Sequence, residues 1–114
     1  MQSTTNLNYL RSISDNDIHF VEDMINTFLE QTPELISEMQ QLVKTNNWYQ
    51  VGRTAHRMKP SLTFMGMADG QRLVKDIEAY SVNPDNCDKL AKLISMLQRE
   101  CEMACNELRR KNIA

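Results

Sequence analysis

The residues best suited to chemistry lie in the stretch AHRMKPSLTFMG, residues 55–66, where His56 precedes Lys59 by three positions. An imidazole with an unprotonated ring nitrogen is a nucleophile, and an ammonium group beside it favours an anionic reaction partner. On a helix that repeats every ~3.6 residues, His56 points away from the apolar stripe and Lys59 lies one turn along the same side. The pattern indicates an exposed, reactive histidine.

Two residues that disfavour helices flank this histidine. Gly52 lies one turn before His56, and Pro60 lies one turn after it. Within a helix, glycine costs roughly 0.5–1 kcal/mol relative to alanine and proline costs ~3 kcal/mol. Gly52 leaves space beside the imidazole, and the missing N–H of Pro60 frees the carbonyl of His56. We therefore expect both residues to shape a site; the alternative is an ordinary surface histidine.

Glu78 is the carboxylate best placed to hold the imidazole. His56 and Glu78 lie eleven residues on either side of Met67, the centre of the connection between two predicted helices. Residues equidistant from the turn of an antiparallel helical hairpin stand level. A carboxylate bound to Nδ1–H would fix the tautomer and leave Nε2 unprotonated. The alternative is an ordinary exposed glutamate.

The apolar pattern that surrounds these residues is helical, and no segment shows the alternation of a strand. We expect a short helix around Leu7, Tyr9 and Leu10, followed by helices at about 15–31, 33–45, 48–64, 69–80 and 84–110. Thr32-Pro33 separates the second helix from the third, because proline suits the first position of a helix. Short connections favour antiparallel neighbours. The sequence predicts an all-α fold: an antiparallel up-and-down four-helix bundle with a short additional N-terminal helix, in one domain over residues 1–114.

The cysteines fall on the apolar stripe of the last predicted helix. There are three, Cys87, Cys101 and Cys105, and an odd number does not indicate a disulfide framework. Free cysteine is among the most buried residue types. We expect these side chains to pack in the core rather than to bind a metal. A metal site that uses His56, His19 and carboxylates is also disfavoured, because the Glu-x-x-His pairs of metal-binding bundles are missing.

Composition argues against several function classes. The formal net charge is −2, whereas nucleic-acid-binding domains are usually strongly basic. No apolar run approaches the ~20 residues that span a bilayer. Residues 1–8 are polar and lack the apolar region of a signal peptide. We therefore expect a cytoplasmic protein that neither binds nucleic acid nor inserts into a membrane.

The segment around His56 resembles the signature of histidine-containing phosphotransfer (HPt) domains of bacterial two-component phosphorelays. The matching residues are His56, Met58, Lys59, Ser61 and Gly66. The segment DIE, residues 76–78, is similar to a later Leu/Ile-Glu element of that family. The resemblance extends to NYLRSIS, FLEQTPELISEM and NNWYQVGRTAH. Pro60 departs from the pattern, since the family usually has glycine directly after the lysine.

This resemblance implies a phosphoryl carrier without kinase activity of its own. His56 Nε2 would accept a phosphoryl group from an aspartyl phosphate of a response-regulator receiver domain and pass it to another receiver. Lys59 would compensate phosphoryl charge and Glu78 would orient His56, while Gly52, Pro60, Ser61 and Gly66 would shape the site. No cofactor is implied, because Mg²⁺ would belong to the receiver. Hybrid sensor histidine kinases are further implied partners, and we expect a monomer.

The expected docking surface is the face around His56. Its polar members are Arg53, Arg57 and Lys75, and its apolar part includes Phe64, Met65, Tyr49 and residues of the second predicted helix. The competing interpretation is a helical adaptor bundle that is never phosphorylated. The two differ in one respect, since the adaptor would tolerate replacement of His56.

Overall fold

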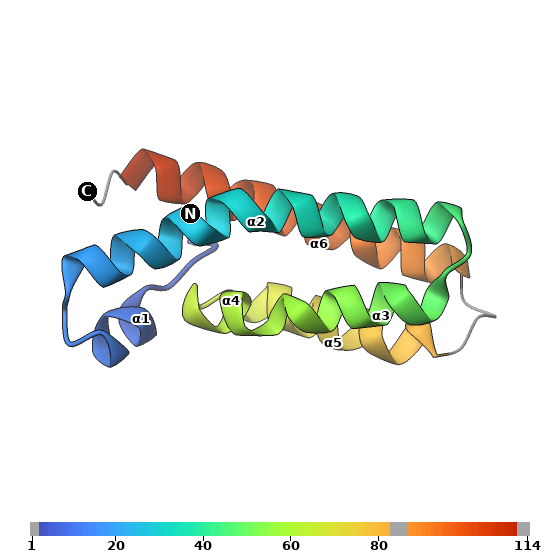
Figure 1. Cartoon of the computed structure of the whole chain (residues 1–114), viewed down its shortest axis with the longest axis horizontal. Coiled ribbons are helices and arrows are strands. Elements are labelled where there is room, and N and C mark those ends of the chain that lie inside the picture. Colours follow the sequence, from blue (N-terminus) through green and yellow to red (C-terminus); the bar gives the residue numbers. More distant parts are fainter. Residues whose placement is uncertain (1–2, 83–86, 112–114) are drawn as a thin grey trace.

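The computed structural model describes residues 3–82 and 87–111. Within these residues all regular structure is helical, so the all-α prediction is confirmed. The helices, shown in Figure 1, are α1 (Asn8–Ile13), α2 (Ile18–Lys44), α3 (Trp48–Arg57), α4 (Lys59–Phe64), α5 (Ala68–Ser81) and α6 (Cys87–Lys111).

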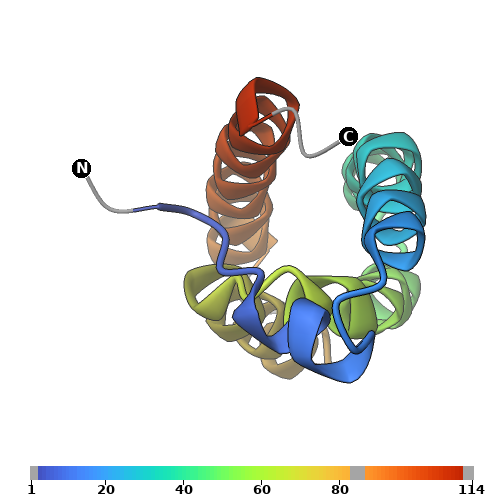
Figure 2. The same cartoon turned by 90° about the vertical axis from the view of Figure 1, so that its left-hand side faces the viewer.

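The four longest helices contact one another in a ring. Helix α2 packs against α3 and α6, and α5 packs against the same two helices. Figure 1 shows that the chain reverses direction from α2 to α3, from α4 to α5 and from α5 to α6. Figure 2 shows α1 lying across the end of the molecule where α4 turns into α5. Helices α3 and α5 are therefore antiparallel neighbours.

The apolar stripes predicted from the sequence meet in one core. The stripe of the predicted fourth helix is buried throughout, from Val51 to Met65. On α6 the thiols of Cys101 and Cys105 are buried, as predicted. The side chain of Cys87 lies outside the described residues. Other buried members of the core are Leu10, Phe28, Ile36, Met39, Leu73, Val74, Ile77, Leu90, Ile94 and Leu97.

Helix α2 is continuous over 27 residues, so the predicted boundary at Thr32-Pro33 is wrong. Phe28, Thr32 and Ile36 are all buried, so the inward stripe crosses Pro33 without a change of spacing. Packing of this stripe against α3 and α6 offsets the ~3 kcal/mol that an internal proline costs. The helix also begins later than predicted. Asp17 caps it by accepting hydrogen bonds from the backbone N–H groups of residues 19 and 20.

The predicted helix at 48–64 is also wrong, because the structure breaks it at Met58 into α3 and α4. Met58 N donates to Ala55 O over 3.0 Å, which closes the last turn of α3. Pro60 lies in the first turn of α4, where a missing N–H costs nothing. Pro60 therefore lies in the first turn of a new helix, and α3 ends one residue after His56.

The turn after α4 sets the register between α3 and α5. Gly66 has a φ of 64°, and the next residue, Met67, donates its N–H to Leu62 O over 3.0 Å. This is the Schellman motif, in which a glycine in the left-handed conformation ends the helix. A Cβ at Gly66 would lie 2.1 Å from Asn6 O, so the N-terminal segment also requires glycine here. The turn returns the chain into α5 alongside α3.

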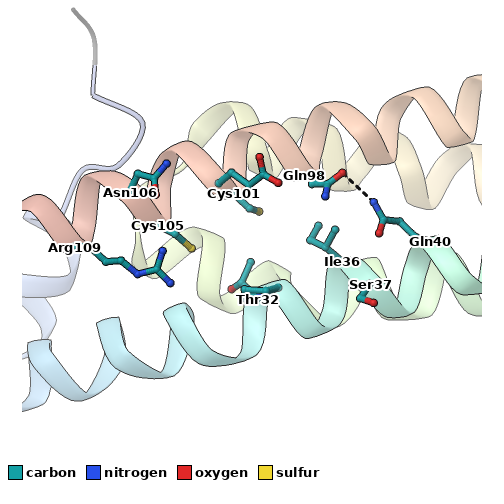
Figure 3. Close-up of a pocket in the computed structure, with 11 residues that line it drawn as sticks. Thr32, Ile36, Ser37, Gln40, Gln98, Cys101, Cys105, Asn106 and Arg109 are labelled. Carbon is teal, nitrogen blue, oxygen red and sulfur yellow. Dashed lines mark hydrogen bonds between the residues drawn. The ribbon is translucent and has the colours of Figure 1, made fainter.

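A hollow of about 400 Å³ lies between α2 and α6. Figure 3 shows Cys101 and Cys105 of α6 facing Thr32 and Ile36 of α2 across this hollow. A hydrogen bond of 2.9 Å from Gln40 Nε2 to Gln98 Oε1 joins the two helices beside it.

Candidate functional site

His56 lies in the last turn of α3 with its side chain 67% exposed. Its Nδ1 is 2.9 Å from Glu78 Oε2 on α5, the contact that the register of the hairpin predicts. A carboxylate at this position favours the tautomer with the proton on Nδ1, which leaves the lone pair on Nε2. The exposed imidazole is thus held through one nitrogen, while the other carries a free lone pair.

Glu78 has a second partner, the cation Lys59. Lys59 Nζ lies 2.6 Å from the buried Oε1 of Glu78, so the two carboxylate oxygens contact two different side chains. Partial burial raises the pKa of the Glu78 carboxyl. Hydrogen bonds from Lys59 and His56, together with the charges of these groups, lower the pKa by more than burial raises it. The net pKa lies below its ordinary value, and the carboxylate is ionised at neutral pH. From the sequence, Lys59 was expected to pair with the phosphoryl group on phosphorylated His56, and its ion pair with Glu78 was not predicted.

Gly52 brings α3 and α5 close together beside the site. A Cβ on Gly52 would lie 2.1 Å from Ser81 Oγ and 2.9 Å from Ser81 Cβ. Any side chain here would push α5 away from α3, and Glu78 with it. The expected reason for this glycine, space beside the imidazole, is therefore incomplete: Gly52 is itself buried against α5. Sequence reasoning missed Ser81, although it lies fourteen residues after Met67 and Gly52 fifteen before it.

A shallow hollow of about 420 Å³ opens around the imidazole, lined by Tyr49, Gly52, Arg53, His56, Arg57, Glu78, Ser81 and Val82. Arg53 lies over the ring of Tyr49 at 6.0 Å from its centroid. Arg57 points to α2, where its NH1 is 3.4 Å from Glu38 Oε2. Both predicted arginines are exposed, but only Arg53 has an aromatic neighbour on the His56 side.

The other predicted docking and shaping residues lie further along α4 and α5. Phe64 is half-buried and stacks on Tyr9 of α1 with 6.2 Å between ring centroids. Lys75 is exposed on α5, and Ser61 is half-buried on α4. Met65 is only 1% exposed, so its place on the predicted docking surface is wrong: it faces the core. The stacking of Tyr9 on Phe64 was not predicted, because a short isolated helix gives no periodic signal.

The described residues offer few alternative sites. Among them, no group of three or more His, Cys, Asp and Glu side chains could hold a metal ion. No helix within 3–82 and 87–111 is long and apolar enough to cross a membrane. In the hollow between α2 and α6, burial raises the pKa of Cys101 to about 12 and also raises the pKa of Cys105. These thiols are poor nucleophiles because the reactive thiolate is scarce.

Comparison with known proteins adds one finding. The family model described as the Hpt domain matches residues 23–109, which include His56, Lys59 and Glu78. Neither a curated protein nor a solved structure with significant similarity was found.

Proposed function

The chain belongs to the Hpt domain family, whose members are phosphocarrier modules of phosphorelays, and from this premise we propose that His56 is the phosphoryl acceptor. The observation that carries the proposal is the exposed imidazole whose Nδ1 is held 2.9 Å from Glu78. The donor would be an aspartyl phosphate on a response-regulator receiver domain, and a second receiver would take the group onward.

The proposed transfer needs little beyond position and charge. The lone pair of His56 Nε2 attacks phosphorus, and the Nε2–P bond forms as the P–O bond to the receiver's aspartate breaks. The bonding electrons leave with the aspartate carboxylate, and the proton on Nδ1 stays in place. The reverse steps deliver the group to the next receiver. Mg²⁺ would belong to the receiver's acidic site.

Each neighbour has a proposed part in this step. Glu78 would keep the proton on Nδ1 and stabilise the positive charge that the ring gains when Nε2 bonds phosphorus. Lys59 would compensate charge on the phosphoryl oxygens, for which an ammonium group is suited. Gly52 would keep α5 near enough for Glu78 to reach the ring. Pro60, Ser61 and Gly66 would shape α4 and its turn.

The proposed docking surface is the exposed face around His56. It includes Arg53 with Tyr49, and it extends along α4 to Phe64 and its stacked partner Tyr9. We propose that receivers, including those of hybrid sensor histidine kinases, bind here to a monomer. We also infer that the helices form the antiparallel four-helix bundle predicted from the sequence, with α1 as the additional helix.

The test is phosphoryl uptake from receiver domains charged with acetyl phosphate and Mg²⁺. We expect acid-labile, alkali-stable phosphate on the wild type and none on His56→Gln. The matched control is His19→Gln, because the chain has two histidines and His19 is also exposed, on α2. The helical adaptor becomes the better interpretation if no receiver labels the wild type, or if His56→Gln is labelled equally.

A further inference from the structure

We propose that Glu78 also binds Lys59 in the unphosphorylated protein, and that Lys59 exchanges Glu78 for the phosphoryl group when His56 is phosphorylated. This inference rests on the proposed function and assigns Glu78 a second part in it. Glu78 would be a positioning residue for both the nucleophile and the cation.

The geometry gives one carboxylate two tasks. Oε2 lies 2.9 Å from His56 Nδ1, and Oε1 lies 2.6 Å from Lys59 Nζ. Oε1 is buried, whereas the side chain of Lys59 is 44% exposed and sits on a flexible four-carbon stem. The cation can therefore move and the carboxylate oxygen cannot. Lys59 is also the first residue of α4, directly after the break at Met58.

The two partners of Lys59 compete for one charge. A phosphoryl group on Nε2 presents oxygens that an ammonium group binds strongly. If Lys59 turns to them, Oε1 remains buried without its cation, and leaving a buried charged acceptor unpaired carries a free-energy cost. Part of the gain from the new contact is lost in this way. Through its contact with Lys59 alone, the carboxylate at position 78 thus weakens the phosphorylated state, and this contribution favours onward transfer over storage.

Glutamine at position 78 separates the two tasks. The amide oxygen of Glu78→Gln still accepts a hydrogen bond from Nδ1–H, but the neutral amide does not hold an ammonium group. Glutamine also removes the negative charge that stabilises the phosphorylated ring, which acts in the opposite direction. The effect of Glu78→Gln must therefore be compared with and without Lys59, for which Lys59→Met keeps the length of the stem and removes the charge.

The experiment measures how a fixed amount of phosphoryl group partitions between His56 and one receiver domain, by ³¹P NMR after acetyl phosphate is removed. The four proteins are the wild type, Glu78→Gln, Lys59→Met and the double variant. We expect Glu78→Gln to favour phosphohistidine roughly five- to tenfold more when Lys59 is present than when methionine replaces it, as expected for directly coupled side chains. Circular dichroism melts establish that all four are folded, and Lys59→Gln is the substitute if the methionine variant is not.

Two results would overturn the proposal in different ways. If Glu78→Gln changes the partition equally with lysine and with methionine at position 59, Lys59 is not exchanged, while the phosphocarrier function stands. If the wild type takes up no phosphoryl group on His56 from any receiver, both proposals fail together.

Discussion

Two hollows of nearly equal volume differ in what their walls can do. The one between α3 and α5 measures about 420 Å³ and contains His56 with its ionised partner Glu78. The one between α2 and α6 measures about 400 Å³ and contains the thiols of Cys101 and Cys105. Size does not distinguish them. The difference is that burial suppresses ionisation of the thiols, whereas the imidazole is exposed and is oriented by the carboxylate of Glu78.

The two helix pairs are also joined in different ways. Gly52 allows α3 to pack directly against Ser81 of α5. At this short separation, the carboxylate of Glu78 on α5 reaches the exposed imidazole of His56 on α3. Between α2 and α6, Gln40 and Gln98 join the helices through their side chains, and the thiols face inward. For a group that must be handed between proteins, an exposed atom with a fixed orientation is worth more than an enclosed space.

The largest effect should be seen in thiol reactivity. In a Cys87→Ser protein, which keeps Cys105, we expect Cys101 to react with iodoacetamide at pH 8 roughly 1000-fold more slowly in the folded state than in urea. The reason is that burial raises its pKa from 9.0 to about 12, which lowers the thiolate fraction by that factor. Alkylation followed by mass spectrometry measures the rates. Similar rates in the two states would mean that the folded protein does not suppress the reactivity of the Cys101 thiol.

The next effect tests the close approach of α3 and α5. Gly52→Ala should destabilise the fold by about 1–3 kcal/mol, the usual cost of forcing a methyl group into a packed contact. It should also slow phosphoryl transfer, since α5 carries Glu78. Urea unfolding and transfer kinetics measure the two effects. Ser81→Gly should restore part of both, because it removes the atoms that the new methyl group meets. A stable, fully active Gly52→Ala protein would contradict the assigned role.

A smaller effect is expected in the other hollow. Gln40→Ala removes the hydrogen bond to Gln98 and should lower the free energy of unfolding by about 0.5–1.5 kcal/mol. Phosphoryl transfer should be unchanged, because the bond joins α2 to α6 and not α3 to α5. Comparable slowing of transfer in this variant and in Gly52→Ala would show that the two hollows are not independent.

The smallest effect concerns pH. Because the pKa of Glu78 in the folded protein lies below its ordinary value of 4.5, its contribution to stability is present above that value and is lost as the pH falls through the folded pKa. Partly exposed ion pairs contribute little, so we expect the wild type to lose on the order of 0.5 kcal/mol more than Glu78→Gln between pH 7 and pH 3. Urea unfolding at both pH values measures the difference. Equal losses would show that the Glu78 carboxylate gains no stability from its contacts with Lys59 and His56.

The two internal prolines show what the sequence could and could not predict about the fold. Helical spacing was enough to find the apolar stripes and the all-α class. It could not decide where proline ends a helix, because proline lies in the interior of α2 at position 33 and in the first turn of α4 at position 60. A buried stripe crosses both positions, from Phe28 to Ile36 on α2 and from Val51 to Met65 across α3 and α4, so burial does not distinguish them. Near Pro60 the helix is interrupted two residues before the proline, at Met58. The spacing of the apolar residues therefore cannot separate these cases.

In the candidate site, register was predictable and side-chain choice was not. Counting outward from Met67 places His56 level with Glu78, and the two are in contact. The ion pair of Lys59 with Glu78 was missed, because a lysine stem has too many rotamers for its partner to be inferred from position. The close contact of Gly52 with Ser81 was missed because a glycine shows only that something lies near.

The break at Met58 also has an electrostatic consequence for His56. The peptide dipoles of a helix add up to a partial negative charge at its C-terminal end, which favours cations in the last turn by about 0.3–1 kcal/mol. In an uninterrupted helix over 48–64, His56 would lie near the middle, where this field is weak. Because α3 ends at Arg57, the histidine occupies the last turn. The imidazole, which in the proposed transfer gains positive charge when Nε2 bonds phosphorus, therefore lies at the negative end of a helix.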